Sequence, residues 1–253
     1  MPITASDFFR PFSLKDQPSA ADYAKIDPLI RSARTFSQVA HQSLYIIDYY
    51  KRGFTYVSDN PLFLCQERPE TVLEQGYDFY LKHVPEEDLT LLLEVNEAGF
   101  TFFGTIPIEE RMDYLISYDF HLRQQNGHLI LINHKLTPLL LDQHANIWTA
   151  LCIASLSSND HSGNIRIRKR GEAELLHYDR AHKKWHKRPV VTLSDRQKEI
   201  LTLSAQGLTM EQIATLLCID ITTVKYHKRN IFRILKCTKT TEAIMKAYNY
   251  KLI

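Results

Sequence analysis

Residues 194–235 constrain the fold most, because they encode several helices in close succession. Ser194 and Gln197 have the spacing of a capping box, in which each side chain bonds to the other residue's backbone N–H at a helix start. Thr209 and Gln212 repeat this pattern a few residues later. The segment therefore predicts two helices that begin at these residues and are joined by a short turn.

The helix ends and a third helix follow from the same local rules. Gly207 suits the left-handed backbone conformation that ends a helix, and the second helix stops near Cys218. Asp220 is a favoured N-cap for the third helix. One side of this third helix is apolar and consists of Val224, Ile231, Ile234 and Leu235. The other side is polar and cationic and consists of Thr222, Lys225, Tyr226, Arg229 and Arg233. A short helix, a tight turn and a cationic second helix is the geometry that places a helix in the DNA major groove.

The distribution of charge supports a polyanionic partner for the C-terminal part. The whole chain has a net formal charge of only +2. Residues 1–160 contain 12 basic and 21 acidic residues, a net of −9, whereas residues 161–253 contain 19 basic and 8 acidic residues, a net of +11. Such asymmetry indicates a basic module that meets a polyanion and an acidic module with another task. A solvated basic face without a partner is the alternative.

Residues 190–253 resemble the LuxR-type four-helix DNA-binding domain. The resemblance is carried by "LSDRQKEIL", "QGLTMEQIATLL", "ITTVKYHKRNIFRIL" and "TEAI". It implies a recognition helix from about Ile221 to Leu235 and a last helix that serves as a dimer contact. Cys218 and Lys236 stand where this family usually has glycine, so we expect a left-handed backbone or a locally different turn at both.

The resemblance also assigns roles to individual residues. Lys225, Tyr226 and Arg229 align with family positions that face bases, and their spacing puts them on one helix surface. Five other residues are expected to contact phosphates, namely Thr209, Thr222, Thr223, Lys228 and Arg233. Thr223 could instead help to cap the helix. His227 is expected to pack on the inward side.

Residues 42–157 predict an antiparallel sheet with helices. "LYIIDYYKRGFTYVS" contains two β-rich runs joined by a turn that ends at Gly53. A helix is expected after Pro85, and a second hairpin is expected to turn at Asn126 and Gly127. "NIWTALCIASL" supplies a further strand.

Two strands, short helices and three strands is the order of a PAS domain, and the segment resembles one in "YVSDNPLFL", "HVPEED" and "RQQNGH". The predicted fold class is therefore α+β: a PAS-like antiparallel sheet with flanking helices, followed by an all-α four-helix LuxR-type helix-turn-helix domain. The resemblance implies a platform for sensing and dimerisation, whose pocket can hold flavin, haem, a small metabolite or nothing, and we expect it to be empty or filled by a metabolite. Six aromatic residues could line such a pocket or form plain core, namely Tyr77, Phe79, Tyr80, Phe100, Phe102 and Phe103.

Two flanking segments complete the predicted organisation. Residues 1–41 are expected to be a helical segment, with a helix that starts at Asp27 and Pro28. Residues 164–188 contain nine basic and three acidic residues with some strand-like alternation, so we expect residues 158–189 to form a basic β-like excursion and a tether. The tether offers further phosphate contacts at Lys183, Lys184, Lys187 and Arg188.

No catalytic, metal or cofactor site is predicted. The chain contains neither the GxSxG motif of serine hydrolases, nor the HExxH motif of zinc proteases, nor a dinucleotide-binding fingerprint. The N-terminal part also lacks the alternating strands and helices of a phosphorylated receiver domain. Cys65 is interpreted as a buried thiol, and His83 and His121 as structural histidines instead of haem ligands. The four cysteines are scattered and no run is long enough to span a membrane, so we expect a cytoplasmic protein.

The sequence thus leaves two functions in competition. The first is a sequence-specific transcriptional regulator that binds double-stranded DNA as a homodimer and receives a signal through its PAS-like domain, with RNA polymerase as a further candidate partner. The second is a PAS interaction module with a sigma-factor-like helix-turn-helix that mainly binds protein. The cationic side of the third helix favours the first.

Overall fold

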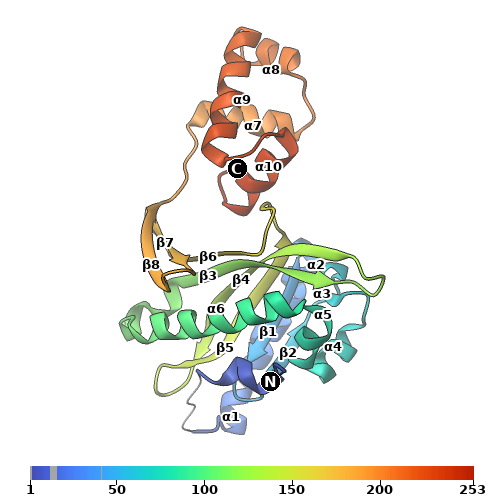
Figure 1. Cartoon of the computed structure of the whole chain (residues 1–253), viewed down its shortest axis with the longest axis vertical. Coiled ribbons are helices and arrows are strands. Elements are labelled where there is room, and N and C mark those ends of the chain that lie inside the picture. Colours follow the sequence, from blue (N-terminus) through green and yellow to red (C-terminus); the bar gives the residue numbers. More distant parts are fainter. Residues whose placement is uncertain (1, 12–15, 41) are drawn as a thin grey trace. The chain divides into compact units, whose positions relative to one another are not determined.

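The computed structural model describes residues 2–11, 16–40 and 42–253 (Figure 1). The chain divides into two compact units that we call the sheet unit and the helical unit. The sheet unit comprises Met1–Leu156 and Asp160–Arg188, and the helical unit comprises Ser157–Asn159 and Pro189–Ile253.

The sheet unit contains an eight-stranded sheet in the order β2-β1-β5-β4-β3-β6-β7-β8. The pairings from β2 to β7 are antiparallel. The strands are β1 (Ser43–Asp48), β2 (Gly53–Val57), β3 (Tyr114–Arg123), β4 (Leu129–Leu141), β5 (Ile147–Leu156), β6 (Gly163–Lys169), β7 (Glu174–Asp179) and β8 (Lys184–Pro189). Strands β1 to β5 have the predicted PAS-like order, in which two strands are followed by helices and then by three strands. The predicted α+β class is confirmed.

Helices lie on both faces of this sheet, and β1 is therefore buried on both of its faces. Tyr45 and Ile47 pack into the large core under the helices that connect β2 and β3, whereas Leu44 and Ile46 pack against a helix on the opposite face. The helices of the unit are α1 (Ala20–Tyr23), α2 (Ile26–Ala40), α3 (Pro61–Leu64), α4 (Pro69–Gln75), α5 (Asp78–His83) and α6 (Glu86–Gly104), with 3-10 turns η1 (Ala5–Phe9) and η2 (Ile108–Asp113).

Both predicted hairpins are present, and turn chemistry explains them. The β3–β4 hairpin turns at Asn126 and Gly127, and Gly127 has a φ of +83°, a conformation that glycine adopts without strain. The β1–β2 hairpin turns at Lys51 and Arg52, where Arg52 is left-handed, whereas Gly53, which the sequence placed in the turn, is the first residue of β2.

Aromatic rings fill the core between the helices and the sheet. Tyr45 stacks on Phe63 with ring centroids 4.2 Å apart. Its hydroxyl group lies 2.8 Å from the Tyr80 hydroxyl and 2.5 Å from Nε2 of His134. Burial lowers the pKa of His134 to about 3, so this imidazole is neutral and its contact with Tyr45 is an uncharged hydrogen bond.

The N-terminal segment contributes to this core in a way that its sequence did not indicate. The helix predicted from Asp27 and Pro28 is α2, but Phe8 and Phe9 of η1 are also fully buried. The ring of Phe9 lies 4.4 Å from that of Tyr77, centroid to centroid. Within the predicted segment 1–41, residues 1, 12–15 and 41 lie outside the described residues.

The basic segment after the fifth strand forms strands, as its alternation predicted, and these strands extend the main sheet up to β8. Strand β6 pairs with β3 from Tyr114↔Lys169 to Asp119↔Gly163 and so extends the sheet. Ile165 and Ile167 are buried, while Trp185 of β8 packs on Tyr178 with centroids 4.8 Å apart. Every second residue therefore faces the core and the basic residues between them face outward, which is the alternation of a half-buried sheet.

We expect Ile165→Ala to destabilise the sheet unit by about 2–5 kcal/mol, because it leaves a cavity in a packed core. Both tryptophans of the chain, Trp148 and Trp185, lie in this unit, so their fluorescence during urea unfolding reports on it alone. Arg168→Ala, at an exposed site of the same strand, should change stability by less than about 0.5 kcal/mol. An unchanged urea midpoint for Ile165→Ala would mean that β6 is not part of the core.

Candidate functional site

The helical unit is a four-helix bundle around a core of its own. Its helices are α7 (Asp195–Ala205), α8 (Met210–Leu216), α9 (Ile221–Leu235) and α10 (Thr240–Asn249). Helix α9 is the centre of the bundle, because its residues Val224, Ile231 and Leu235 are buried against α7, α8 and α10. The predicted apolar side of this helix is thereby confirmed, although Ile234 is only half-buried.

The two capping boxes fix where α7 and α8 begin. The Ser194 backbone N–H donates to the Gln197 side chain at 2.9 Å, and the Gln197 N–H donates to the Ser194 hydroxyl at 3.3 Å. Thr209 and Gln212 make the same pair of bonds at 2.9 and 3.3 Å. Each box satisfies backbone N–H groups that a helix start otherwise leaves without partners.

The two positions without the usual glycine adopt a left-handed backbone, which is the first of the two alternatives left open by the sequence. Cys218, between α8 and α9, has a φ of 51°, and Lys236, at the end of α9, has a φ of 50°. After each, the chain closes the helix end: the Ile219 N–H donates to the Ala214 carbonyl, and the Cys237 N–H donates to the Phe232 carbonyl, both at 3.0 Å. The helix-turn-helix geometry is therefore kept, at a cost of order 1 kcal/mol for each side chain.

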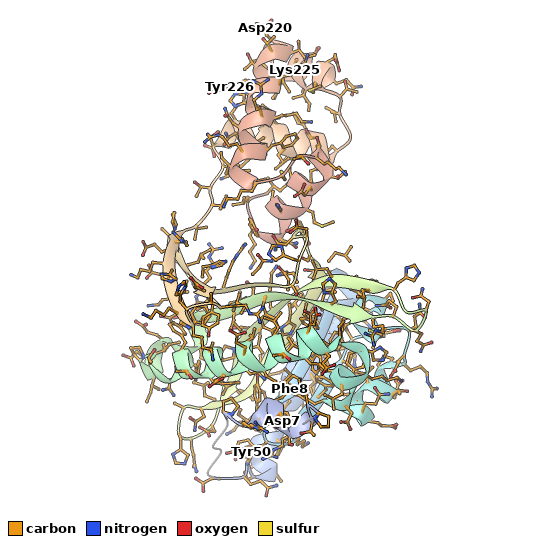
Figure 2. The ribbon with its side chains drawn as sticks, viewed as in Figure 1. Asp7, Phe8, Tyr50, Asp220, Lys225 and Tyr226 are labelled. Atoms are coloured by element: carbon orange, nitrogen blue, oxygen red, sulfur yellow. The ribbon has the colours of Figure 1, made fainter. Side chains whose placement is uncertain are left out.

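Helix α9 presents one exposed polar row. Five residues of this helix are exposed and follow helical spacing, namely Thr222, Lys225, Tyr226, Arg229 and Arg233. Asp220 takes the predicted N-cap position with an extended backbone but makes no capping hydrogen bond through its side chain. Figure 2 shows Asp220, Lys225 and Tyr226 around the first turns of this helix. We call Lys225, Tyr226 and Arg229 the base-reading triad, after the contact that the sequence predicts for them.

Some of the other predicted contact residues are less exposed to solvent than this row. Lys228 and Thr223 are half-buried, and burial lowers the pKa of the Lys228 ammonium group. Lys228 stands four residues after Val224, so its stem lies beside the buried side of α9 and only its end can reach an anion. Thr209 is exposed, and its hydroxyl oxygen accepts the capping bond described above. His227 is half-buried, as predicted, beside the Tyr226 ring.

Two basic residues that position α9 were not identified from the sequence. Arg196 of α7 donates to the Leu217 carbonyl at 3.2 Å and so holds the end of α8. Lys246 of α10 is buried, donates to the Lys236 carbonyl at 2.9 Å and pairs with Glu242 at 2.9 Å. The spacing of four residues between Glu242 and Lys246 could have predicted their ion pair, but it does not predict the bond from Lys246 to the Lys236 carbonyl.

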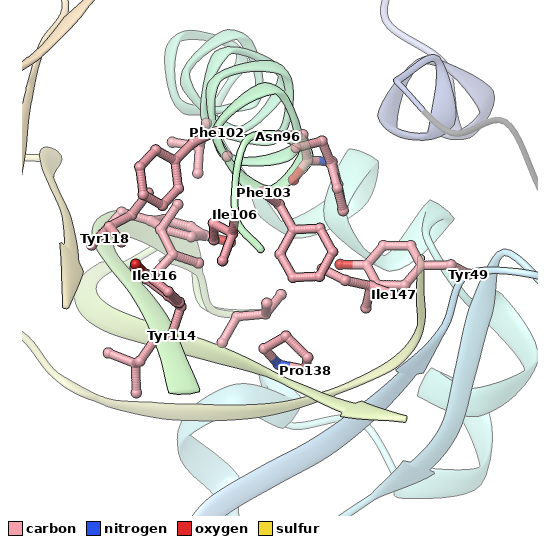
Figure 3. Close-up of a pocket in the computed structure, with 16 residues that line it drawn as sticks. Tyr49, Asn96, Phe102, Phe103, Ile106, Tyr114, Ile116, Tyr118, Pro138 and Ile147 are labelled. Atoms are coloured by element: carbon pink, nitrogen blue, oxygen red, sulfur yellow. The ribbon is translucent and has the colours of Figure 1, made fainter. Parts of the chain in front are cut away.

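The sheet unit contains an apolar cavity of about 60 Å³ between α6 and the sheet. Figure 3 shows Phe102 and Phe103 on one side of it, with Ile116 and Pro138 on the strands opposite. Of the six predicted aromatic residues, Phe100, Phe102 and Phe103 line the cavity, whereas Tyr77, Phe79 and Tyr80 are core residues away from it.

The residues considered as cofactor ligands have protein partners. His83 bonds through Nδ1 to the Arg123 carbonyl and through Nε2 to Glu67, both at 2.8 Å. His121 bonds to Asp88 at 2.8 Å. Burial raises the pKa of the Cys65 thiol to about 12, which keeps it protonated.

Within residues 2–11, 16–40 and 42–253, no group of three or more His, Cys, Asp or Glu side chains is arranged to hold a metal ion. None of the described helices is both long and apolar enough to cross a membrane.

Comparison with known proteins identifies the helical unit. Residues 191–247 match the family profile "Bacterial regulatory proteins, luxR family". The response regulator protein VraR of Staphylococcus aureus is 32% identical over 105 residues, which is 40% of this chain and 50% of VraR. The chain thus spans about half the length of the VraR relatives that it matches.

Among solved structures, the fold is similar to Vibrio cholerae VqmA in the absence of target DNA, with 14% identity, 84% of this chain and 86% of that chain covered, and a TM-score of 0.34. It is also similar to a light-oxygen-voltage domain, with 19% identity, 54% and 90% coverage and a TM-score of 0.37.

We expect Cys218→Gly and Lys236→Gly each to stabilise the helical unit by up to about 1 kcal/mol, because glycine relieves the strain of a positive φ. Gly207→Ala is the matched control and should destabilise the unit by about 1 kcal/mol or more, since Gly207 has a φ of +89°. Thermal unfolding followed by far-ultraviolet circular dichroism measures all three. Lower midpoints for both glycine variants would show that these turns are not left-handed.

Proposed function

We propose that this chain, whose C-terminal residues 191–247 are of the luxR family of bacterial regulatory proteins, is a sequence-specific DNA-binding transcriptional regulator with a PAS-like sensor domain. The observation that carries the proposal is the exposed polar row of α9 on a helix that a buried apolar core fixes in place. A rigid cationic helix beside a tight turn is suited to the major groove. Regulation of transcription implies action in the cytoplasm.

The base-reading triad is proposed to contact base edges. Lys225 and Arg229 are one turn apart and can donate to guanine O6 and N7, while Tyr226 lies beside them with 60% of its surface exposed. The Glu211 carboxylate at the start of α8 is a charged neighbour of Lys225, whose positive charge helps to lower the Glu211 pKa.

Phosphate contacts are proposed for the five other residues, which lie around the triad. Thr222 and Arg233 extend the exposed row at its two ends, whereas Thr209 and Thr223 stand near helix starts, where backbone N–H groups also favour anions. Lys228 reaches a phosphate only by extending its half-buried stem. These contacts would set the register of α9 on DNA without reading sequence.

A homodimer is proposed because a two-fold operator requires two recognition helices about one DNA turn apart. Helix α10 supports this proposal, since Tyr248 and Met245 are exposed on it beside the buried Ala247. RNA polymerase is the further partner proposed for a bound regulator. The sigma-factor-like alternative is separated from this proposal by the DNA measurement below.

A small ligand is proposed for the apolar cavity of the sheet unit. A space of about 60 Å³ admits a few non-hydrogen atoms, and the wall is almost entirely apolar, with Asn96 and the hydroxyl-bearing Tyr49, Tyr114 and Tyr118 as its polar members. The suitable ligand class is therefore a small, mainly apolar metabolite with one or two polar atoms. Native mass spectrometry of the purified protein identifies it.

Arg229→Ala should weaken binding to the cognate site by about 1–3 kcal/mol and relax discrimination at one position of each half-site, because a bidentate contact to guanine is lost. Cognate DNA is first selected from genomic fragments at physiological salt. Arg233→Ala is the matched control, since the loss of a phosphate contact weakens cognate and random DNA alike. Equal weakening of both DNAs by Arg229→Ala would refute base reading, and the absence of selected fragments would favour the sigma-factor-like alternative.

The complex with a cognate duplex should contain two chains per DNA, because each half-site requires one α9. Analytical ultracentrifugation at micromolar protein, with and without the duplex, measures the stoichiometry. Tyr248→Ala should reduce dimer formation, whereas Lys251→Ala, also near the C-terminus, serves as the control. One chain per duplex at saturation would contradict the proposal.

A further inference from the structure

We infer that the outer face of β6, β7 and β8 is a second DNA-binding surface, which holds phosphates that flank the sequence contacted by α9. The inference rests on the proposed DNA-binding function and adds a site in the sheet unit to it. We call this surface the cationic strand face. Its basic and imidazole side chains are those of Arg166, Arg168, His177, Lys184, His186 and Arg188.

Strand alternation places these residues on one face. On β6, Ile165 and Ile167 point into the core, so Arg166 and Arg168 point outward. On β7, Tyr178 points into the core, so His177 and Asp179 point outward. In the β6–β7 register, Arg166 lies opposite His177, while Ile167 lies opposite Leu176.

The same rule orients β8. Trp185 packs inward on Tyr178 and on Phe102, with ring centroids 4.8 and 5.8 Å apart. Its neighbours Lys184 and His186 therefore point outward, and Arg188 follows His186 by two residues. Residues two apart on a strand lie about 6.8 Å from each other, and neighbouring strands lie about 4.8 Å apart, so the side chains form one patch.

The charges on this patch act on each other. Burial lowers the pKa of His177, and the positive charges of Arg166 on β6 and Arg188 on β8 lower it further. Asp179 is the carboxylate of the same face, and His182 bonds to it at 2.9 Å. Four cations therefore face one carboxylate, and the patch has a clear excess of positive charge.

Three of these cations are available to a partner. Arg168, Lys184 and Arg188 are exposed, and none of them forms an ion pair with a carboxylate within the described residues. Lys187, by contrast, is on the inner side and pairs with Glu174 at 3.4 Å. The cationic strand face is thus not needed to neutralise the protein's own acidic groups.

Double-stranded DNA is the partner that fits this chemistry best. Its closely spaced phosphates attract cations that protein carboxylates do not neutralise, and such contacts need no apolar surface. Only Val190–Ser194 separate β8 from α7, so the cationic strand face and α9 belong to one short-linked chain. When one surface has bound a DNA molecule, the short link raises the effective concentration of the other at the same molecule.

The test is a full-length variant that removes the three exposed charges, Arg168→Gln, Lys184→Gln and Arg188→Gln. On a long duplex that contains the selected site and its flanks, the salt slope of binding should fall by about 2–3 units, because three phosphates retain their counterions. Cognate and random DNA should weaken alike, and the preferred sequence should not change. Arg168→Lys with Arg188→Lys should bind like the wild type, since charge alone is required.

The matched control is Arg31→Gln, Arg34→Gln and Arg68→Gln, which removes three exposed charges elsewhere in the sheet unit and should leave the slope unchanged. Tryptophan fluorescence during urea unfolding verifies that both variants fold. A wild-type slope for the β6–β8 variant would overturn the inference while leaving the proposed function intact. Failure of the wild-type chain to bind any DNA would overturn the proposed function itself. Loss of self-association with an unchanged slope would assign the face to an acidic second copy instead, and would equally overturn the inference.

Discussion

The backbone pairing of β3 with two neighbours is the interaction on which the sheet unit depends. Strand β3 bonds to β4 from Ile116↔Leu136 to Arg123↔Leu129 on one edge, and to β6 on the other. The first pairing completes the PAS-like sheet and supplies a wall of the apolar cavity through Ile116. The second brings β6 to β8, which carry a large share of the positive charge, into the same sheet. The proposed ligand cavity and the proposed DNA-binding face therefore involve neighbouring strands of one sheet.

The helical unit could be predicted almost completely from the sequence, because its determinants are local. Capping boxes, a glycine and an apolar stripe each act over a few residues, and α7 to α9 begin where these patterns placed them. The left-handed turns at Cys218 and Lys236 were also predictable from the positions of the missing glycines. The carbonyl that Lys246 binds was not, since it lies ten residues away across a turn.

The sheet unit was less predictable, because its partners are distant in sequence. The hairpins follow from turn residues, but the pairing of β6 with β3 joins segments about 50 residues apart. The alternation in residues 164–188 indicated strands, but no local pattern reports which strand they pair with. The burial of Phe8 has the same cause, since its carbonyl accepts from Asn96, 88 residues later. The sequence identified the aromatic residues of α6 that line the cavity, but it could not distinguish them from aromatic residues that only fill the core.

Strand β6 shows how tightly the two faces of the sheet are linked. Ile165 and Ile167 fill the core, while Arg166 and Arg168 project outward, and the backbone bonds to β3 hold both sets in place. Because side chains alternate with a period of two, insertion or deletion of one residue at the start of β6 would bury the arginines and expose the isoleucines. Changes of length in this strand are therefore tolerated only in steps of two residues, whereas the turn at Gly171 is free of that restriction.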